Sequence, residues 1–140
     1  MQEKTTTFSA AVCLVCLVMA VQLCAEDGPD YRSETNIVYS TVAGKALWLN
    51  AFTPVSAPAP LPAMVEIHGG WWSGGRAAAQ LEQVGGWQFY KRHGLAVFSV
   101  EYRLGREGGF PENIRDCRNA IRFLRQNAKR FNIDPTHWRD

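Results

Sequence analysis

The sequence predicts an α/β fold, with an antiparallel hairpin followed by parallel strands that are joined by crossover helices. Two observations carry this prediction. Apolar residues alternate on both sides of a short Gly turn within residues 35–52, which is the pattern of a hairpin. Two later apolar runs, Ala63 to Ile67 and Leu95 to Val100, are each followed by a segment of helical character. Helices between apolar strands indicate parallel pairing within one sheet.

The first element is a targeting segment, and we expect residues 1–25 to be a signal peptide. Lys4 precedes an unbroken apolar run from Ala10 to Val21, and Leu23-Cys24-Ala25 offers a small residue for cleavage. The run is shorter than the ~20 apolar residues of a membrane span. We therefore expect a secreted or periplasmic protein with no stable membrane span after cleavage. An uncleaved N-terminal anchor and a lipid-anchored Cys24 are the alternatives, and the bulky Leu23 argues against the second.

Composition argues against several classes of function. The hydrophobic share of 46% and charged share of 20% are ordinary for a globular chain, and the net charge of +2 is too small to predict nucleic-acid binding. Only Cys117 lies outside the leader, and we expect it to be a buried core residue, so no disulfide framework is predicted. The three histidines have no carboxylate or cysteine at ligand spacing. No metal and no cofactor are therefore expected.

The hairpin is predicted from two strands and a turn. Thr35 to Ser40 forms the first strand, Ala43-Gly44-Lys45 the turn, and Ala46 to Phe52 the second strand, with one apolar side facing the core. The segment Pro54 to Pro62 contains four prolines and cannot be a helix or a central strand. We expect it to be an exposed connection to the strand Ala63 to Ile67.

Two helices are predicted after that strand. Trp87 to His93 reads as a short helix that Gly94 ends. The run Leu95 to Val100 is nearly continuously apolar, which indicates a strand covered on both faces. Pro111 then begins a long amphipathic helix, and Asp134-Pro135 ends it. Its apolar face recurs at three- and four-residue steps and consists of Ile114, Cys117, Ala120, Ile121, Leu124, Ala128 and Phe131.

The stretch from Ala63 to Gly75 is the candidate functional feature. An apolar strand ends in His68-Gly69-Gly70 and opens into a Gly-rich loop with Trp71 and Trp72. Glycines allow a sharp turn and leave backbone N–H groups uncovered, and free N–H groups at a strand end are what an oxyanion hole needs. A tight turn without chemistry is the alternative. The two tryptophans either pack in the core or line the mouth of the site.

The ordered motifs resemble the N-terminal half of an α/β-hydrolase of the esterase/lipase type, related to hormone-sensitive lipase and the BD-FAE-like enzymes. The resemblance covers the chain from about residue 31 to its end. The matching motifs are His68-Gly69-Gly70-Trp71-Trp72-Ser73-Gly74, Val100-Glu101-Tyr102-Arg103-Leu104, Phe110-Pro111-Glu112 with Asp116, Ala120-Ile121-Arg122-Phe123-Leu124, and Phe131-Asn132-Ile133-Asp134-Pro135.

The resemblance implies that the backbone N–H groups of Gly70 and Trp71 form the oxyanion hole, with His68 and Gly69 in support. His68 would shape the turn and would not be the general base. Where the family often has a third glycine this chain has Trp71, whose side chain would narrow the acyl pocket.

Supporting roles are also expected beyond the loop. Tyr102 and Arg103 would tether loops and would not touch substrate. Asp116 would either hold Arg103 or cap a loop.

The catalytic triad is not expected within this chain. No Gly-x-Ser-x-Gly occurs, and Ser73 lacks the glycine two positions before it, so we reject it as the nucleophile. We expect residues 26–140 to be the N-terminal portion of an α/β-hydrolase domain that stops before the nucleophile elbow. The strand Ala63 to Ile67 would then be an open apolar edge of an incomplete sheet.

The expected function is therefore that of a secreted serine carboxylester hydrolase that acts on a small-molecule ester. This chain would supply the oxyanion loop of that enzyme. The chain alone is expected to be inactive. Two alternatives remain open: a non-catalytic half-sheet that binds a ligand, and a fragment of a serine peptidase of the same fold. No feature of the sequence indicates an oligomeric state.

Overall fold

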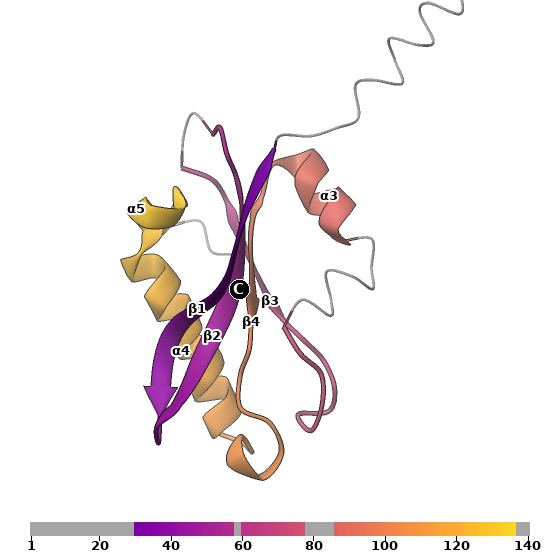
Figure 1. Cartoon of the computed structure of the whole chain (residues 1–140), viewed down its shortest axis with the longest axis vertical. Coiled ribbons are helices and arrows are strands. Elements are labelled where there is room, and N and C mark those ends of the chain that lie inside the picture. Colours follow the sequence, from indigo (N-terminus) through magenta and orange to yellow (C-terminus); the bar gives the residue numbers. More distant parts are fainter. Residues whose placement is uncertain (1–29, 58–59, 78–85, 137–140) are drawn as a thin grey trace, which may run out of the picture.

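The computed structural model describes residues 30–57, 60–77 and 86–136, and the predicted signal peptide lies outside them. Their elements are β1 (Tyr31–Val42), β2 (Lys45–Pro54), β3 (Ala63–Ile67), α3 (Gly86–His93), β4 (Ala96–Val100), the 3₁₀ turn η1 (Gly105–Glu107), α4 (Glu112–Gln126) and α5 (Ala128–Phe131). The strands form one mixed sheet of four, in the order β1-β2-β4-β3. Helix α3 lies on one side of this sheet, and α4 and α5 lie on the other (Figure 1).

The predicted hairpin is confirmed, and both of its strands are longer than the alternation indicated. β1 and β2 pair antiparallel, and the pair Val42 and Lys45 closes a two-residue turn. Both turn residues, Ala43 and Gly44, have positive φ, of 49° and 79°. That conformation matches the twist of a tight hairpin turn. Alternate residues of β2, namely Leu47, Leu49 and Ala51, are buried in the core as predicted.

Strand β4 is the centre of the fold. All five of its residues are buried, which confirms a strand covered on both faces. It pairs antiparallel with β2 and parallel with β3. Within the residues that the structure describes, β3 pairs with β4 alone and is the edge strand of the sheet. Met64 and Ile67 on β3 are exposed.

The long amphipathic helix is confirmed with two differences. It divides at Asn127, whose φ of −104° and ψ of 19° depart from helical geometry, so that α4 and α5 are separate. The Phe123 carbonyl accepts from both the backbone N–H and the side-chain amide of Asn127, at 3.0 and 2.8 Å. Ile114 was predicted to be on the buried face, but it is exposed because it lines a cleft with two tryptophans. Leu124 and Phe131 do pack in the core with Phe98 of β4.

The Pro-rich connection is hydrogen-bonded to the residues that follow α5. The Leu61 N–H donates to the Asn132 carbonyl at 2.8 Å, and the Asp134 N–H donates to the Leu61 carbonyl at 2.9 Å. Val55, Ser56 and Pro60 are exposed, as expected of a surface connection.

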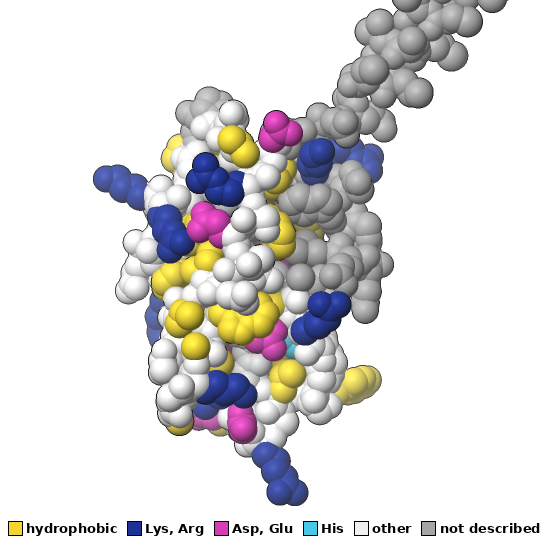
Figure 2. Space-filling model, in the orientation of Figure 1, with side chains coloured by type: hydrophobic (Ala, Val, Ile, Leu, Met, Phe, Trp, Pro, Cys, Tyr) yellow, Lys and Arg dark blue, Asp and Glu magenta, His cyan; other side chains and the backbone are white. Residues whose placement is uncertain are grey.

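The distribution of charge and the character of the helices complete the description. Figure 2 shows the Lys and Arg side chains at separate points on one face of the molecule, without a single basic patch. In the described ranges, no helix combines the length and the apolar character needed to cross a membrane.

Candidate active site

The loop that follows β3 turns back on itself through one carbonyl group. The Gly70 carbonyl accepts from the Ser73 N–H at 3.1 Å, from the Gly74 N–H at 3.0 Å and from the Ser73 hydroxyl at 3.2 Å. The central residues of the turn, Trp71 and Trp72, have positive φ of 56° and 57°. A Cβ on Gly70 would lie 2.1 Å from the Gly74 carbonyl oxygen. Position 70 therefore requires glycine.

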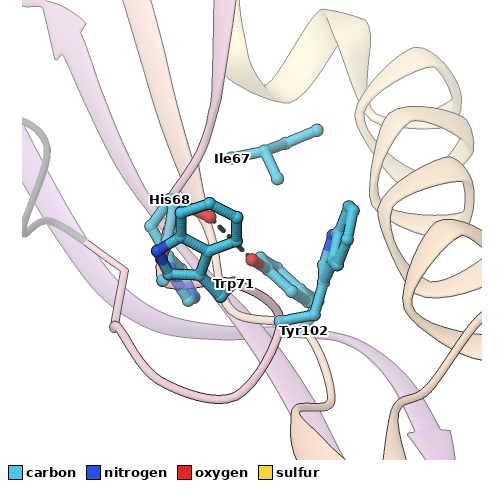
Figure 3. Close-up of a pocket in the computed structure, with 7 residues that line it drawn as sticks. Ile67, His68, Trp71 and Tyr102 are labelled. Carbon is cyan, nitrogen blue, oxygen red and sulfur yellow. Dashed lines mark hydrogen bonds between the residues drawn. The ribbon is translucent and has the colours of Figure 1, made fainter.

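The N–H groups of Gly70 and Trp71 face no acceptor. Neither donates a hydrogen bond to a protein group in the part of the chain that the structure describes. The residues that carry them line a pocket of about 440 Å³, together with Ile67, His68 and Tyr102 (Figure 3). Adjacent free donors at the end of a parallel strand form an arrangement that suits a developing negative charge.

His68 is a buried support beneath this loop. Its side chain is 3% exposed, and its Nδ1 lies 2.9 Å from the Gly69 carbonyl oxygen. The ring stacks on Tyr102 with centroids 4.5 Å apart. A Cβ on Gly75 would lie 2.4 Å from His68 Nδ1, so the loop packs directly against the imidazole. His68 Nε2 lies 3.9 Å from a Glu101 oxygen, which is too far for a hydrogen bond, and no other described residue gives it a partner.

A single segment after β4 fixes the loop at three points. The Tyr102 hydroxyl donates to the His68 carbonyl at 2.6 Å, at the start of the loop (Figure 3). The Gly105 N–H donates to the Trp72 carbonyl at 2.7 Å, in its middle. A Glu101 carboxylate oxygen accepts from the Ala77 N–H at 2.7 Å, at its end. Burial of the phenol raises the pKa of Tyr102.

Sequence reasoning expected a tether from Tyr102 but missed Glu101 and Gly105. The signal in the sequence is a carboxylate, Glu101, directly after a strand whose residues are all buried. Such a charge next to the core needs a donor, and here the donor comes from the loop.

Arg103 points to α4 and not to the pocket. Its Nε and Nη2 donate to the two Asp116 carboxylate oxygens at 2.7 and 2.9 Å, and Nη2 also donates to Glu112 at 3.1 Å. The Asp116 side chain raises the pKa of Arg103 by hydrogen bonding to the charged guanidinium. The structure shows both roles predicted for Asp116: its carboxylate holds the Arg103 guanidinium, and its Oδ2 also accepts from the Arg103 backbone N–H at 3.2 Å, in the loop after β4. A Cβ on Gly108 would lie 1.9 Å from the Arg103 carbonyl oxygen, so this turn is also closely packed.

The site has no nucleophile of its own among the described residues. Ser73 is exposed, and its hydroxyl is bonded to the Gly70 carbonyl and not to a histidine. His93 is exposed on α3, and His137 lies outside the described residues. The described part of the chain also contains no group of three His, Cys, Asp or Glu side chains that could hold a metal ion.

Comparison with known proteins identifies the family. The family model described as BD-FAE matches residues 49–138, which include the loop, β4 and both later helices. The chain belongs to the BD-FAE family. The match begins within β2, so the first strand of the hairpin lies outside it.

Solved structures agree with the BD-FAE assignment. A truncated carbohydrate esterase from gut microbiota is 30% identical to this chain with a TM-score of 0.63, and a bacterial heroin esterase is 25% identical with a TM-score of 0.60. The first match covers 78% of this chain and the second covers 93%. The fold is therefore that of an α/β-hydrolase, and the family is one of esterases.

A characterised relative by sequence is Gut esterase 1 of Caenorhabditis elegans, which is 31% identical over 121 residues, a match that covers 76% of this chain. The matched part is only 20% of that relative, and the chain spans 39% and 40% of the two solved structures named above. This BD-FAE chain thus corresponds to less than half of the esterases that it matches.

Proposed function

We propose that this chain supplies the oxyanion hole of a secreted serine carboxylester hydrolase. The observation that carries the proposal is the pair of N–H groups at Gly70 and Trp71, which donate to no group among the described residues and belong to residues that line a pocket with the buried His68. The esterases among its structural neighbours support ester over amide as the reacting bond.

The proposed mechanism is acyl transfer. A serine would attack the ester carbonyl, a histidine would carry the proton from the serine to the departing alcohol, and an acid would orient that histidine. The two N–H groups would bind the oxygen as it becomes negative. Removing one such donor in other enzymes costs about 3 kcal/mol of transition-state stabilisation. We place the nucleophile, the base and the acid in the C-terminal half of the hydrolase domain, after Asp140 in the sequence.

The first test uses the 140-residue chain. We expect no hydrolysis of p-nitrophenyl acetate above that of its Ser73→Ala variant, because the Ser73 hydroxyl donates to a carbonyl and has no base beside it. Turnover that disappears in Ser73→Ala would show that Ser73 is the nucleophile and would overturn the proposed division of roles. Binding of an unrelated ligand by an inactive chain would favour a non-catalytic half-sheet.

The second test reads the coding sequence beyond Asp140. A Gly-x-Ser-x-Gly motif soon after Asp134-Pro135 would support the proposal, and a stop codon would contradict it for this chain. In a product that carries the motif, Gly70→Ala should lower kcat about 10²- to 10³-fold, as loss of an oxyanion donor does elsewhere. A new Cβ would collide with the Gly74 carbonyl and displace the donors.

The matched control for that variant is Gly44→Ala. Gly44 also has positive φ, of 79°, but a Cβ there would meet nothing within 4 Å. Gly44→Ala carries the backbone strain of positive φ without the collision, so it should lose less stability than Gly70→Ala and keep its kcat. Equal loss of kcat in both variants would mean that strain, and not the position of the donors, explains the effect.

Hydrolysis of p-nitroanilides in preference to p-nitrophenyl esters would indicate a peptidase.

Secretion is a separate part of the proposal, because it rests on residues 1–25 alone. N-terminal sequencing of the product exported by an expressing cell should begin at Glu26. A product that retains Lys4 and stays with the membrane fraction would indicate an uncleaved anchor.

A further inference from the structure

His68 has a buried ring nitrogen that finds no hydrogen-bond partner among the described residues. Its side chain is 2% exposed, and the atom without a partner is Nε2. The other ring nitrogen, Nδ1, lies 2.9 Å from the Gly69 carbonyl oxygen. Because a carbonyl oxygen can only accept, Nδ1 carries a proton. In the neutral ring Nε2 is therefore a bare acceptor inside the protein.

The group that faces Nε2 is a carboxylate. Glu101 Oε2 lies 3.9 Å from Nε2, and the same oxygen accepts from the Ala77 N–H at 2.7 Å. Two acceptors cannot bond to each other, and a buried polar atom without a partner is unfavourable. A proton on Nε2 would turn this nitrogen into a donor and would remove the conflict.

The elements around the ring carry other titratable and charged groups. They are Tyr102 and Arg103 after β4, Asp116 and Cys117 on α4, Glu66 on β3, Tyr90 on α3 and Arg76 in the loop. Burial raises the pKa values of Tyr102 and Cys117, so both are neutral below about pH 9. The charged groups among them already have other partners. Among the described residues, Glu101 is therefore the charge that faces Nε2.

We propose that one proton, held between His68 Nε2 and Glu101 Oε2, closes the loop after β3. With the ring protonated, Nε2 donates to the oxygen that also accepts from Ala77, so one carboxylate joins the start of the loop to its end. A charge-assisted bond of this kind is about 2.7–2.9 Å long, so the two groups would move closer. Burial opposes a charge on the ring, but the imidazolium and the carboxylate together carry no net charge.

The proton would also act on the candidate oxyanion hole. Gly70 and Trp71 follow His68 by two and three positions, and the Tyr102 hydroxyl holds the His68 carbonyl at 2.6 Å. A ring drawn toward Glu101 would therefore fix the segment that carries the two N–H groups. Glu101 is then a positioning residue that does not touch substrate. This effect on catalysis rests on the proposed function, whereas the shared proton does not.

The test is a pH titration of the 140-residue chain followed by NMR. Histidine ordinarily changes charge between about pH 5 and 8, so the titration covers that range. We expect the His68 ring nitrogens and the Ala77 amide to shift with one common midpoint, because one proton moves both. His93, exposed on α3, is the reference within the same sample. Its midpoint should not be the one that the Ala77 amide follows.

The decisive variant is Glu101→Gln. It removes the negative charge but keeps a side-chain oxygen that can accept from the Ala77 N–H. We expect the pH-dependent shift of the Ala77 amide to fall about fivefold or more, because a neutral amide stabilises an imidazolium less than a carboxylate does. Glu34→Gln makes the same change at a carboxylate that accepts from Arg130 at 2.9 Å, and should leave the shift unchanged.

A second variant, His68→Asn, removes the titrating group itself. The asparagine amide can still donate to the Gly69 carbonyl, as Nδ1 does, but nothing replaces Nε2. We expect the pH-dependent shift of the Ala77 amide to disappear.

Three results would overturn the inference: a His68 ring that keeps one charge state from pH 5 to 8, an Ala77 amide that does not follow the ring, or an unchanged Ala77 shift in Glu101→Gln. The first two come from the unmodified chain, so they decide the matter even if a variant fails to fold. None of these measurements requires hydrolysis. A chain that shows the shared titration but belongs to no active esterase would count only against the proposed function.

Discussion

At the scale of single residues, Arg103 and Asp116 form a bidentate ion pair, with bonds of 2.7 and 2.9 Å. Asp116 is fully buried, and both of its oxygens accept from the same guanidinium. Two parallel charge-assisted bonds of this kind fix the orientation of both groups. Because Arg103 follows Tyr102, which holds the loop, the pair connects the candidate site to α4.

Replacing Asp116 should test how much the fold depends on this pair. We expect Asp116→Ala to lower the free energy of unfolding by about 3–5 kcal/mol, because it leaves a mostly buried guanidinium without its main partner. Glu112→Ala removes the second, half-exposed carboxylate and should cost about 1 kcal/mol or less. Urea unfolding of both variants measures the difference. Similar small losses in the two would show that the pair contributes little.

Cys117 should make stability depend on pH. Burial raises the pKa of its thiol to about 11, from the ordinary value of 9.0. Above pH 9 the unfolded chain loses this proton and the native chain keeps it, so the unfolded state binds fewer protons and native stability falls as pH rises. The loss should develop between about pH 9 and 11. Urea unfolding across that range should show a smaller decrease in Cys117→Ala, and identical decreases would exclude this thiol as the cause.

At the scale of elements, the loop after β3 is held by the segment after β4 and not by its own hydrogen bonds alone. Tyr102, Gly105 and Glu101 contact its start, middle and end. Because β3 and β4 are parallel neighbours, their carboxyl ends meet at one edge of the sheet. The parallel pairing thus places the segment that supports the donors beside the donors themselves.

Tyr102→Phe should loosen this loop specifically. The variant keeps the ring that stacks on His68 and removes the hydroxyl that donates to the His68 carbonyl. The Ala77 N–H donates from the loop to Glu101, and the Gly105 N–H donates to the Trp72 carbonyl in the loop. We expect both amides to exchange hydrogen about tenfold faster in Tyr102→Phe. Tyr31→Phe removes a hydroxyl that donates to Tyr90 and Leu95 carbonyls elsewhere. If Tyr31→Phe raises the hydrogen-exchange rates of the same two amides equally, the effect of Tyr102→Phe is a general loss of stability.

The elements differ in how far their sequence predicts them. β4 is apolar at every position but Ser99, and α4 has a sustained helical period, so both follow from local pattern. The apolar spacing does not predict the break at Asn127, because Ala128 and Phe131 continue it, while the backbone of Asn127 leaves helical geometry with φ of −104° and ψ of 19°. The contact between Glu101 and Ala77 joins residues 24 apart and exists only once the sheet is formed. The exposure of Ile114 likewise depends on where the tryptophan loop lies.

At the scale of the whole molecule, the position of β3 decides how the chain behaves in solution. β3 carries the candidate site at its end, and in the described residues it is an edge strand with exposed Met64 and Ile67. An apolar edge with unpaired backbone groups is a template for pairing with another chain. The esterases that it resembles are more than twice as long, so much of their structure has no counterpart here.

Charging this edge should therefore suppress self-association. We expect Met64→Lys to reduce the apparent association constant of the 140-residue chain about tenfold or more, because lysine on an edge strand is a means by which natural sheets block pairing. Light scattering across a concentration series measures it. Val55→Lys places the same charge on an exposed apolar residue of the Pro-rich connection, away from the edge, and should have little effect. Equal suppression by both variants would attribute association to general hydrophobicity or net charge. If Met64→Lys alone acts, the open edge of β3 is the surface through which copies of the chain associate.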